Sequence, residues 1–138
     1  MPNGINTMYY FAYASNLNQK QMRERCPGAR PLFPATLHHY QLAFTGWSRI
    51  QRGATATIRA FRGGKVLGGV YEVSEECLRH MDAKEGSDYR RLKVIVNNED
   101  GEPAEVVTYI KSGNDKVDKP SPEYLALIQQ GYRDWQLV

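Results

Sequence analysis

The sequence predicts an α+β fold, in which a small mixed β-barrel is flanked by helices. Segments of strand character and of helix character are segregated along the chain instead of alternating strictly. Their order is strand, helix, several strands, helix, hairpin and helix, which favours a curved or barrel-like mixed sheet. The chain has 138 residues, 41% of them hydrophobic, and contains no long linker. We therefore expect a single domain over residues 1–138.

The first strand is predicted in "TMYYFAY", Thr7 to Tyr13, because this run is continuously apolar and aromatic, as in strands buried on both faces. A helix is expected shortly afterwards. Asn18 is a typical N-cap, and Gln21 stands three residues further on, as in a capping box. The helix should end at "CPG", residues 26–28, because proline disfavours helical geometry in the residue before it.

The middle of the chain is rich in strand patterns. Strands are predicted in "YQLAFTG" (40–46), "ATATIRAF" (54–61) and "VLGGVYEV" (66–73), the last two being separated by a turn at "RGGK" (62–65). Two further alternating runs, "RLKVIV" and "EVVTYIK", flank a segment containing Asp100 and Gly101, which is a strong hairpin signal.

Two more helices are indicated by their caps. Ser74 begins one that Gly86 can end, and Ser121 begins the last, with Pro122 in its first turn. The last helix carries an apolar stripe that is expected to pack on the sheet, formed by Tyr124, Leu127, Ile128, Gly131 and Trp135.

Composition limits the kind of protein. No apolar run approaches the roughly 20 residues of a membrane span, and "MPNGINT" lacks the features of a secretion signal, so we expect a cytoplasmic protein without a membrane partner. Cys26 and Cys77 are far apart and have no C-x-x-C spacing, so we expect two buried thiols and neither a disulfide nor a zinc site. The first half of the chain is basic and the second acidic. Because the halves of one mixed domain interleave, this asymmetry does not by itself predict a nucleic-acid surface.

Glu85 departs from the pattern of its helix. It lies seven residues after Leu78 and four after Met81, which places a carboxylate on the same stripe as two apolar side chains. Burial and the negative end of the helix dipole should both raise its pKa, as suits a general acid/base. The alternative, that Glu85 extends into water at the helix end, stays open at this point.

The turn after Tyr13 offers a complementary feature. Its small residues let backbone N–H groups approach a ligand, and the start of the following helix favours an anion. Small residues that serve only the sterics of the turn are the other interpretation.

These features resemble the gamma-glutamylcyclotransferase-like family, which includes AIG2-like proteins and gamma-glutamylamine cyclotransferases. The family's Tyr-Gly-Ser-Asn-Leu loop is similar to Tyr13–Leu17, and its Asp-x-x-Glu-Gly segment is similar to Asp82–Gly86, followed by Tyr89. Similarity extends to "GATATI", "VLGGVYEV" and the closing helix, over about residues 8–137.

The resemblance implies a small-molecule gamma-glutamyl substrate, with no cofactor or metal, and we expect no nucleic-acid partner from the charge distribution. In the family's reaction, the α-amino group attacks the side-chain amide carbonyl of the same molecule, giving 5-oxoproline and a free amine, as in a lyase or acyltransferase. Glu85 matches the family's catalytic glutamate. The residues that match substrate-binding positions are Tyr13, Ala14, Ser15, Asn16, Leu17, Tyr89 and Tyr124.

Ala14 departs from the family, which usually has glycine there. If the position requires a positive φ, alanine is strained, whereas if glycine serves close approach, the methyl group narrows the pocket and changes the substrate.

Three other functions compete with the cyclotransferase. A serine hydrolase would use Ser15 with His80 or His38, but the G-x-S-x-G pattern is absent. His38 and His39 would point to opposite faces of a strand, which argues against a shared metal.

A catalytically silent module would bind a small acid or a protein terminus in the same pocket. A barrel that binds single-stranded nucleic acid would show salt-dependent affinity. The sequence leaves the particular gamma-glutamyl amine and the oligomeric state open.

Overall fold

The structure is a computed structural model that describes residues 7–113 and 115–137. Five strands form a closed barrel in the order β1-β3-β2-β4-β5. The strands are β1 (Thr7–Ala12), β2 (Arg30–Ser48), β3 (Gly53–Ser74), β4 (Tyr89–Asn98) and β5 (Pro103–Lys111). Strands β1 and β5 pair in parallel and the other pairs are antiparallel, so the sheet is mixed. The predicted fold class is confirmed. Residues 1–6, which hold most of the stretch considered for a secretion signal, lie outside the described residues.

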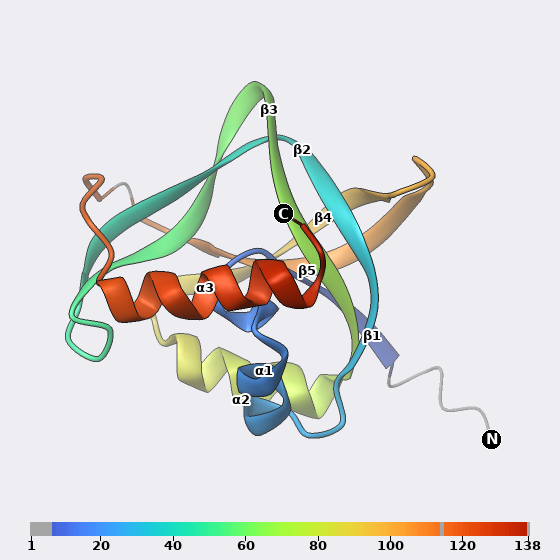
Figure 1. Cartoon of the computed structure of the whole chain (residues 1–138), viewed down its shortest axis with the longest axis horizontal. Helices are drawn as coiled ribbons and strands as arrows, with labels where there is room; N and C mark the ends of the chain where they lie inside the picture. Colours follow the sequence, from blue (N-terminus) through green and yellow to red (C-terminus); the bar gives the residue numbers. More distant parts are fainter. Residues whose placement is uncertain (1–6, 114, 138) are drawn as a thin grey trace.

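Strands β2 and β3 form one long, bent hairpin that rises above the rest of the barrel (Figure 1). The prediction of a turn at residues 62–65 is wrong, because β3 continues through them and both of its halves pair with β2. The register passes from Tyr40↔Ala60 to His38↔Lys65, so an irregular bulge takes the place of the turn. His39 and Gly63 both have positive φ here, which lets the strands bend sharply.

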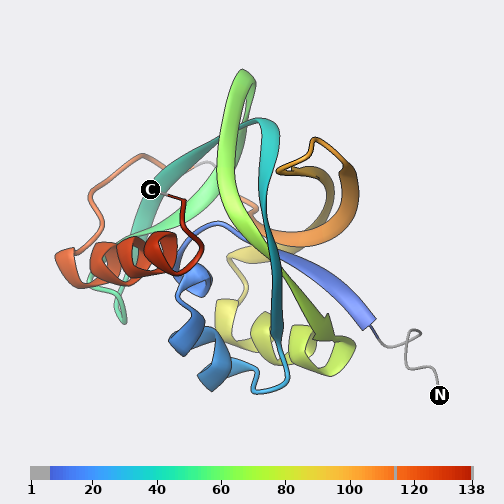
Figure 2. The same cartoon turned by 45° about the vertical axis from the view of Figure 1, so that its right-hand side comes forward.

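Three helices cover the barrel: α1 (Gln19–Arg25), α2 (Glu75–Glu85) and α3 (Pro122–Asp134). All three lie near the closed, lower part of the barrel, with α1 beside α2 and α3 passing across the strands (Figures 1 and 2). Each has the predicted N-cap, because the side chains of Asn18, Ser74 and Ser121 accept hydrogen bonds from the first turns. No helix in the described ranges is long and apolar enough to cross a membrane.

The core has two parts because β1 is buried on both sides. Phe11 lies within the barrel, whereas Tyr10 and Ala12 pack in a second cluster with residues of α1 and α2 such as Met22 and Leu78. Tyr9, near the start of the strand, stays exposed. The predicted burial therefore holds for the end of β1, which leads directly into the turn of interest.

The expectation of two free thiols is wrong. Cys26 and Cys77 form a disulfide, with Cα atoms 5.6 Å apart. The bond joins the C-cap of α1 to the first turn of α2. A separation of 51 residues gives no sign of this pairing, which depends on the packing of the two helices.

Candidate active site

A small cavity lies where the end of β1, the last turn of α2 and the start of β4 meet. It has a volume of about 40 Å³, which is room for a few water molecules. Its walls come from segments far apart in the sequence, and they consist of Tyr10, Tyr13, Ala14, Ser15, Asn16, Ala56, Glu85, Tyr89, Tyr109 and Tyr124. One carboxylate thus faces a ring of tyrosines and a helical turn.

The turn is a short 3₁₀ helix, Ser15–Leu17, inserted between β1 and α1. Its hydrogen bonds run from Leu17 N to the carbonyl of Ala14 (3.0 Å) and from Asn18 N to that of Ser15 (3.0 Å). The N–H groups of Ser15 and Asn16 begin the turn and so have no acceptor within it. Both residues line the cavity, so these donors are suited to an anion or a developing oxyanion.

Asn16 is fixed by its side chain. Nδ2 donates to Tyr10 Oη (2.9 Å) and lies 3.8 Å from Met81 Sδ. Oδ1 accepts from Gln21 Nε2 (3.2 Å) and Arg25 Nη1 (2.8 Å). The expected capping box is therefore incomplete, because the Gln21 side chain bonds Asn16 instead of the backbone of the cap. A buried amide with every group bonded has one orientation, which makes this wall of the cavity rigid.

Glu85 ends α2 on the stripe that begins with Leu78 and Met81, both fully buried. Gly86 follows with a φ of 78° and releases the chain from the helix. The carboxylate is half-buried at the cavity wall. Burial raises the pKa of Glu85, the Arg25 guanidinium lowers it, and Asp82 raises it. The net effect is a raised pKa, as predicted, which brings the group nearer to neutral pH.

The tyrosine hydroxyls are held by the barrel. Tyr13 Oη donates to the carbonyl of Tyr109 (2.7 Å), and Tyr89 Oη donates to the carbonyl of Ala56 (2.6 Å). Tyr124 Oη accepts from the N–H of Ala56 (3.0 Å). Burial raises the pKa of Tyr13, Tyr89 and Tyr124, so all three hydroxyls stay protonated and neutral at physiological pH.

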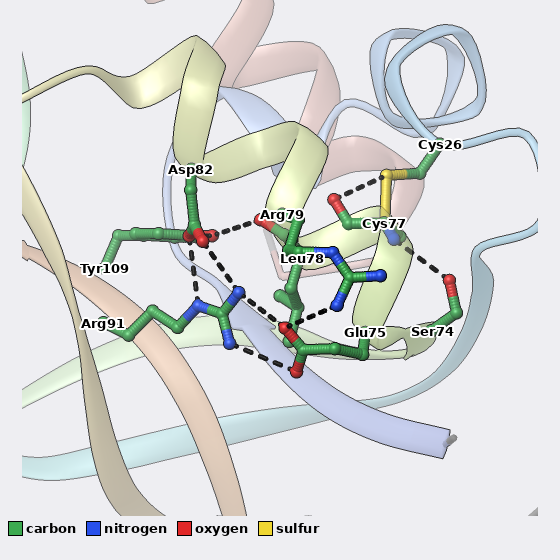
Figure 3. Close-up of polar contacts among 9 residues, drawn as sticks. All are labelled: Cys26, Ser74, Glu75, Cys77, Leu78, Arg79, Asp82, Arg91 and Tyr109. Carbon is green, nitrogen blue, oxygen red and sulfur yellow. Dashed lines mark hydrogen bonds and ion pairs between the residues drawn. A yellow bond between two sulfur atoms is a disulfide. The ribbon is translucent and has the colours of Figure 1, made fainter.

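An ion-pair network attaches α2 to the barrel (Figure 3). Arg91 of β4 contacts Asp82 (2.7 Å) and Glu75 (2.9 Å), and Tyr109 Oη of β5 donates to Asp82 (2.5 Å). Hydrogen bonds from Arg91 hold the pKa of Asp82 below its usual value. The network fixes the helix on which Glu85 is placed, one turn before its end.

The structure brings most of the predicted site residues to one cavity, with one exception. Leu17 is buried in the core, and its carbonyl accepts from Trp135 Nε1 (2.9 Å). Ala14 has a φ of −137°, so the positive φ considered for this position does not occur, and the residue lines the cavity while it packs against the barrel core.

Sequence reasoning missed Tyr10, Ala56 and Tyr109 in the wall, and Arg25 behind Asn16. Tyr10 lies in the predicted first strand, but no local pattern places it in the wall, and the other positions depend on how distant segments pack. Among the described residues no group of histidine, cysteine and acidic side chains is arranged to hold a metal ion.

The structure thus combines a closed mixed barrel with a carboxylate of raised pKa in a cavity that a helical turn also lines. The model of a family described as "Gamma-glutamyl cyclotransferase, AIG2-like" matches residues 10–136. The gamma-glutamylcyclotransferase of Bos taurus is 30% identical over 132 residues, covering 91% of this chain and 70% of the bovine protein. The Homo sapiens protein of the same name is 29% identical with the same coverage.

Solved structures agree with these sequence relatives. A structure described as a gamma-glutamyl cyclotransferase has a TM-score of 0.91 and 28% identity, and the match covers 95% of this chain and 81% of that one. This chain therefore belongs to the gamma-glutamyl cyclotransferase, AIG2-like family.

Proposed function

We propose that this protein is a gamma-glutamyl cyclotransferase, which converts a gamma-glutamyl amide into 5-oxoproline and a free amine. The observation that carries the proposal is Glu85, a half-buried carboxylate of raised pKa in a cavity that a helical turn also lines. The relatives' printed names support the same reaction class.

Glu85 would act as the general base and then the general acid. The substrate's α-ammonium must lose a proton before its nitrogen can attack the side-chain carbonyl carbon. A C–N bond forms to close the five-membered ring, and the bond to the leaving nitrogen breaks. The attacking nitrogen loses two protons in becoming the lactam N–H, and the leaving amine gains two as an ammonium. Glu85 passes protons between these nitrogens, and the reaction balances without another reactant.

The turn and the tyrosines would supply position and charge stabilisation. The N–H groups of Ser15 and Asn16 are suited to the substrate's α-carboxylate or to the oxyanion that develops on the attacked carbonyl. Tyr89 and Tyr124 would confine the glutamyl chain in a bent conformation, in which its two ends approach each other. We propose that the glutamyl part binds at this cavity, with the leaving amine toward its mouth.

A substrate panel tests this proposal. Purified protein is incubated with gamma-glutamyl amino acids, gamma-glutamyl-lysine and glutathione, and 5-oxoproline and the free amine are quantified. We expect equal amounts of both from at least one compound, and none from an analogue with an acetylated α-amino group, which lacks the nucleophile. Release of glutamate in place of 5-oxoproline would indicate a hydrolase. No release from any compound would favour the silent binding module.

A further inference from the structure

We propose that Arg25 is a positioning residue of this active site, which holds Asn16 in the cavity wall and supplies the positive charge that faces Glu85. The inference rests on the proposed function for its kinetic consequence. It goes beyond the predicted site residues, none of which lies on α1.

Direct contact connects Arg25 to the cavity. Its Nη1 atom lies 2.8 Å from Asn16 Oδ1, and the Nδ2 atom of the same amide donates to Tyr10 Oη at 2.9 Å. A guanidinium only donates, so it fixes which end of the amide is the oxygen. The amide nitrogen is thereby directed at Tyr10, which also lines the cavity.

The base of the Arg25 side chain is fixed relative to the helix that carries Glu85. The next residue, Cys26, is bonded to Cys77 in the first turn of α2. The N–H of Cys26 also donates to the carbonyl of Met22 at 2.8 Å, which completes α1. The disulfide therefore restrains the end of α1, where Arg25 lies, relative to α2.

The charges around Glu85 make Arg25 distinctive. The charges of Arg25 of α1 and Asp82 of α2 act on the carboxylate, and the titratable groups that line the cavity with it are Tyr10 of β1, Tyr13 after it, Tyr89 of β4, Tyr109 of β5 and Tyr124 of α3. Among these described groups Arg25 is the one cation. It lowers the pKa of Glu85, Tyr10 and Tyr124, whereas Arg91 is engaged by Asp82 and Glu75. Without Arg25, burial and Asp82 would act on Glu85 unopposed.

A simpler role exists for a basic residue at this place. Arg23 and Arg25 both lie in the last turn of α1, where a cation interacts favourably with the negative end of the helix. Arg23 is exposed, and its charge acts on Tyr71 instead of on Glu85. Arg23→Gln is therefore a matched control that loses the helix-end charge and keeps the contact with Asn16.

The kinetic test is the pH dependence of kcat/KM for 5-oxoproline release. For Arg25→Gln we expect the acidic limb to move upward by about one pH unit, because the base is harder to ionise, with about a tenfold loss at a pH on that limb. Arg25→Lys keeps the charge and should restore the wild-type limb, and Arg23→Gln should match the wild type. An Arg25→Gln limb that coincides with the wild-type limb, in an active enzyme, contradicts the inference and leaves the proposed function intact.

A second measurement does not depend on turnover. The ¹³C resonance of the Glu85 carboxyl, assigned by its loss in Glu85→Gln, is titrated in the wild type, Arg25→Gln, Arg25→Lys and Arg23→Gln. We expect the midpoint to rise in Arg25→Gln alone. If the wild type released no 5-oxoproline, the proposed function would fail, and this titration would still decide whether Arg25 controls Glu85. An unchanged midpoint in Arg25→Gln overturns the inference.

Discussion

Arg91 of β4 forms a bidentate contact with Asp82 of α2, in which Nε lies 3.1 Å from Oδ1 and Nη2 lies 2.7 Å from Oδ2. Asp82 lies three residues before Glu85 in α2, so this contact with the barrel helps to fix the position of the last turn of the helix. Bidentate pairs of this kind are more directional than ordinary surface ion pairs.

Replacing Arg91 should therefore affect both stability and activity. For Arg91→Gln we expect the Tm to fall by about 3 °C or more, because one guanidinium serves two carboxylates and fixes a helix. We also expect kcat/KM to fall severalfold as Glu85 becomes less well positioned. Thermal unfolding and initial rates measure the two effects. Arg90→Gln, on the neighbouring exposed side chain, is the control, and equal effects in the two variants would contradict this role.

The same network should make stability depend on acidity. Arg91 lowers the pKa of Asp82 and Glu75 in the folded protein. A depressed carboxyl pKa contributes stability that is present above the unfolded value, about 4, and is lost as the pH falls through the lower folded value. Urea unfolding of the wild type should show this loss below about pH 4, and Arg91→Gln should show a smaller one. Parallel curves for the two proteins would refute the assignment.

Glu85 titrates in the opposite sense. Its folded pKa is raised, so the stability that it contributes is present below the unfolded value and is lost as the pH rises through the folded one. Glu85→Gln should therefore gain stability relative to the wild type as the pH rises, and it should be at least as stable at pH 7–8. Urea unfolding at pH 7.5 checks this, and a clearly less stable variant would show that the carboxylate is structural.

Ala14 should influence which substrates are used. Its φ of −137° is negative and the residue lines a cavity of about 40 Å³, so we expect its methyl group to act through the space that it takes up there. In Ala14→Gly we expect the ratio of kcat/KM between two gamma-glutamyl substrates to change severalfold, with a loss of stability of about 0.5–1 kcal/mol from the freer unfolded chain. An unchanged ratio would mean that the methyl group does not limit the substrate.

The disulfide should contribute to stability. Closing a loop of 51 residues restricts the unfolded chain and is worth about 4 kcal/mol in the chain-entropy model. The double variant Cys26→Ala/Cys77→Ala should unfold at lower urea concentration than the oxidised wild type, and the wild type in dithiothreitol should approach it. Disulfides are rare in a reducing cytosol. The urea concentration at the unfolding midpoint is therefore measured for both the oxidised and the reduced wild type. Coincident curves in all cases would show that the bond adds nothing.

Local signals predicted most of the fold, Glu85 and the turn after Tyr13, whereas Tyr89 and Tyr124 were expected only from the family resemblance. The caps at Asn18, Ser74 and Ser121 and the hairpin at Asp100–Gly101 depend on neighbours in sequence, and they were predictable for that reason. Glu85 was visible because a carboxylate on an apolar helical stripe breaks a short-range pattern.

The errors share a physical cause, which is dependence on distant partners. The segment at residues 62–65 has the composition of a turn, yet β3 continues there because both of its halves pair with β2. Cys26 meets Cys77 only because α1 packs beside α2. Tyr109, Ala56 and Arg25 enter the site through strand pairing and helix packing that no local pattern encodes.

The most direct test of the central claim compares the wild type with Glu85→Gln in a 5-oxoproline assay at pH 7.5. The substrate is the panel compound with the highest wild-type rate, and circular dichroism checks that both proteins are folded. We expect the wild type to release 5-oxoproline and the free amine in equal amounts, and Glu85→Gln to lose about 100-fold or more in kcat. Wild-type turnover that survives in a folded Glu85→Gln would contradict the assignment of Glu85 as the general acid/base.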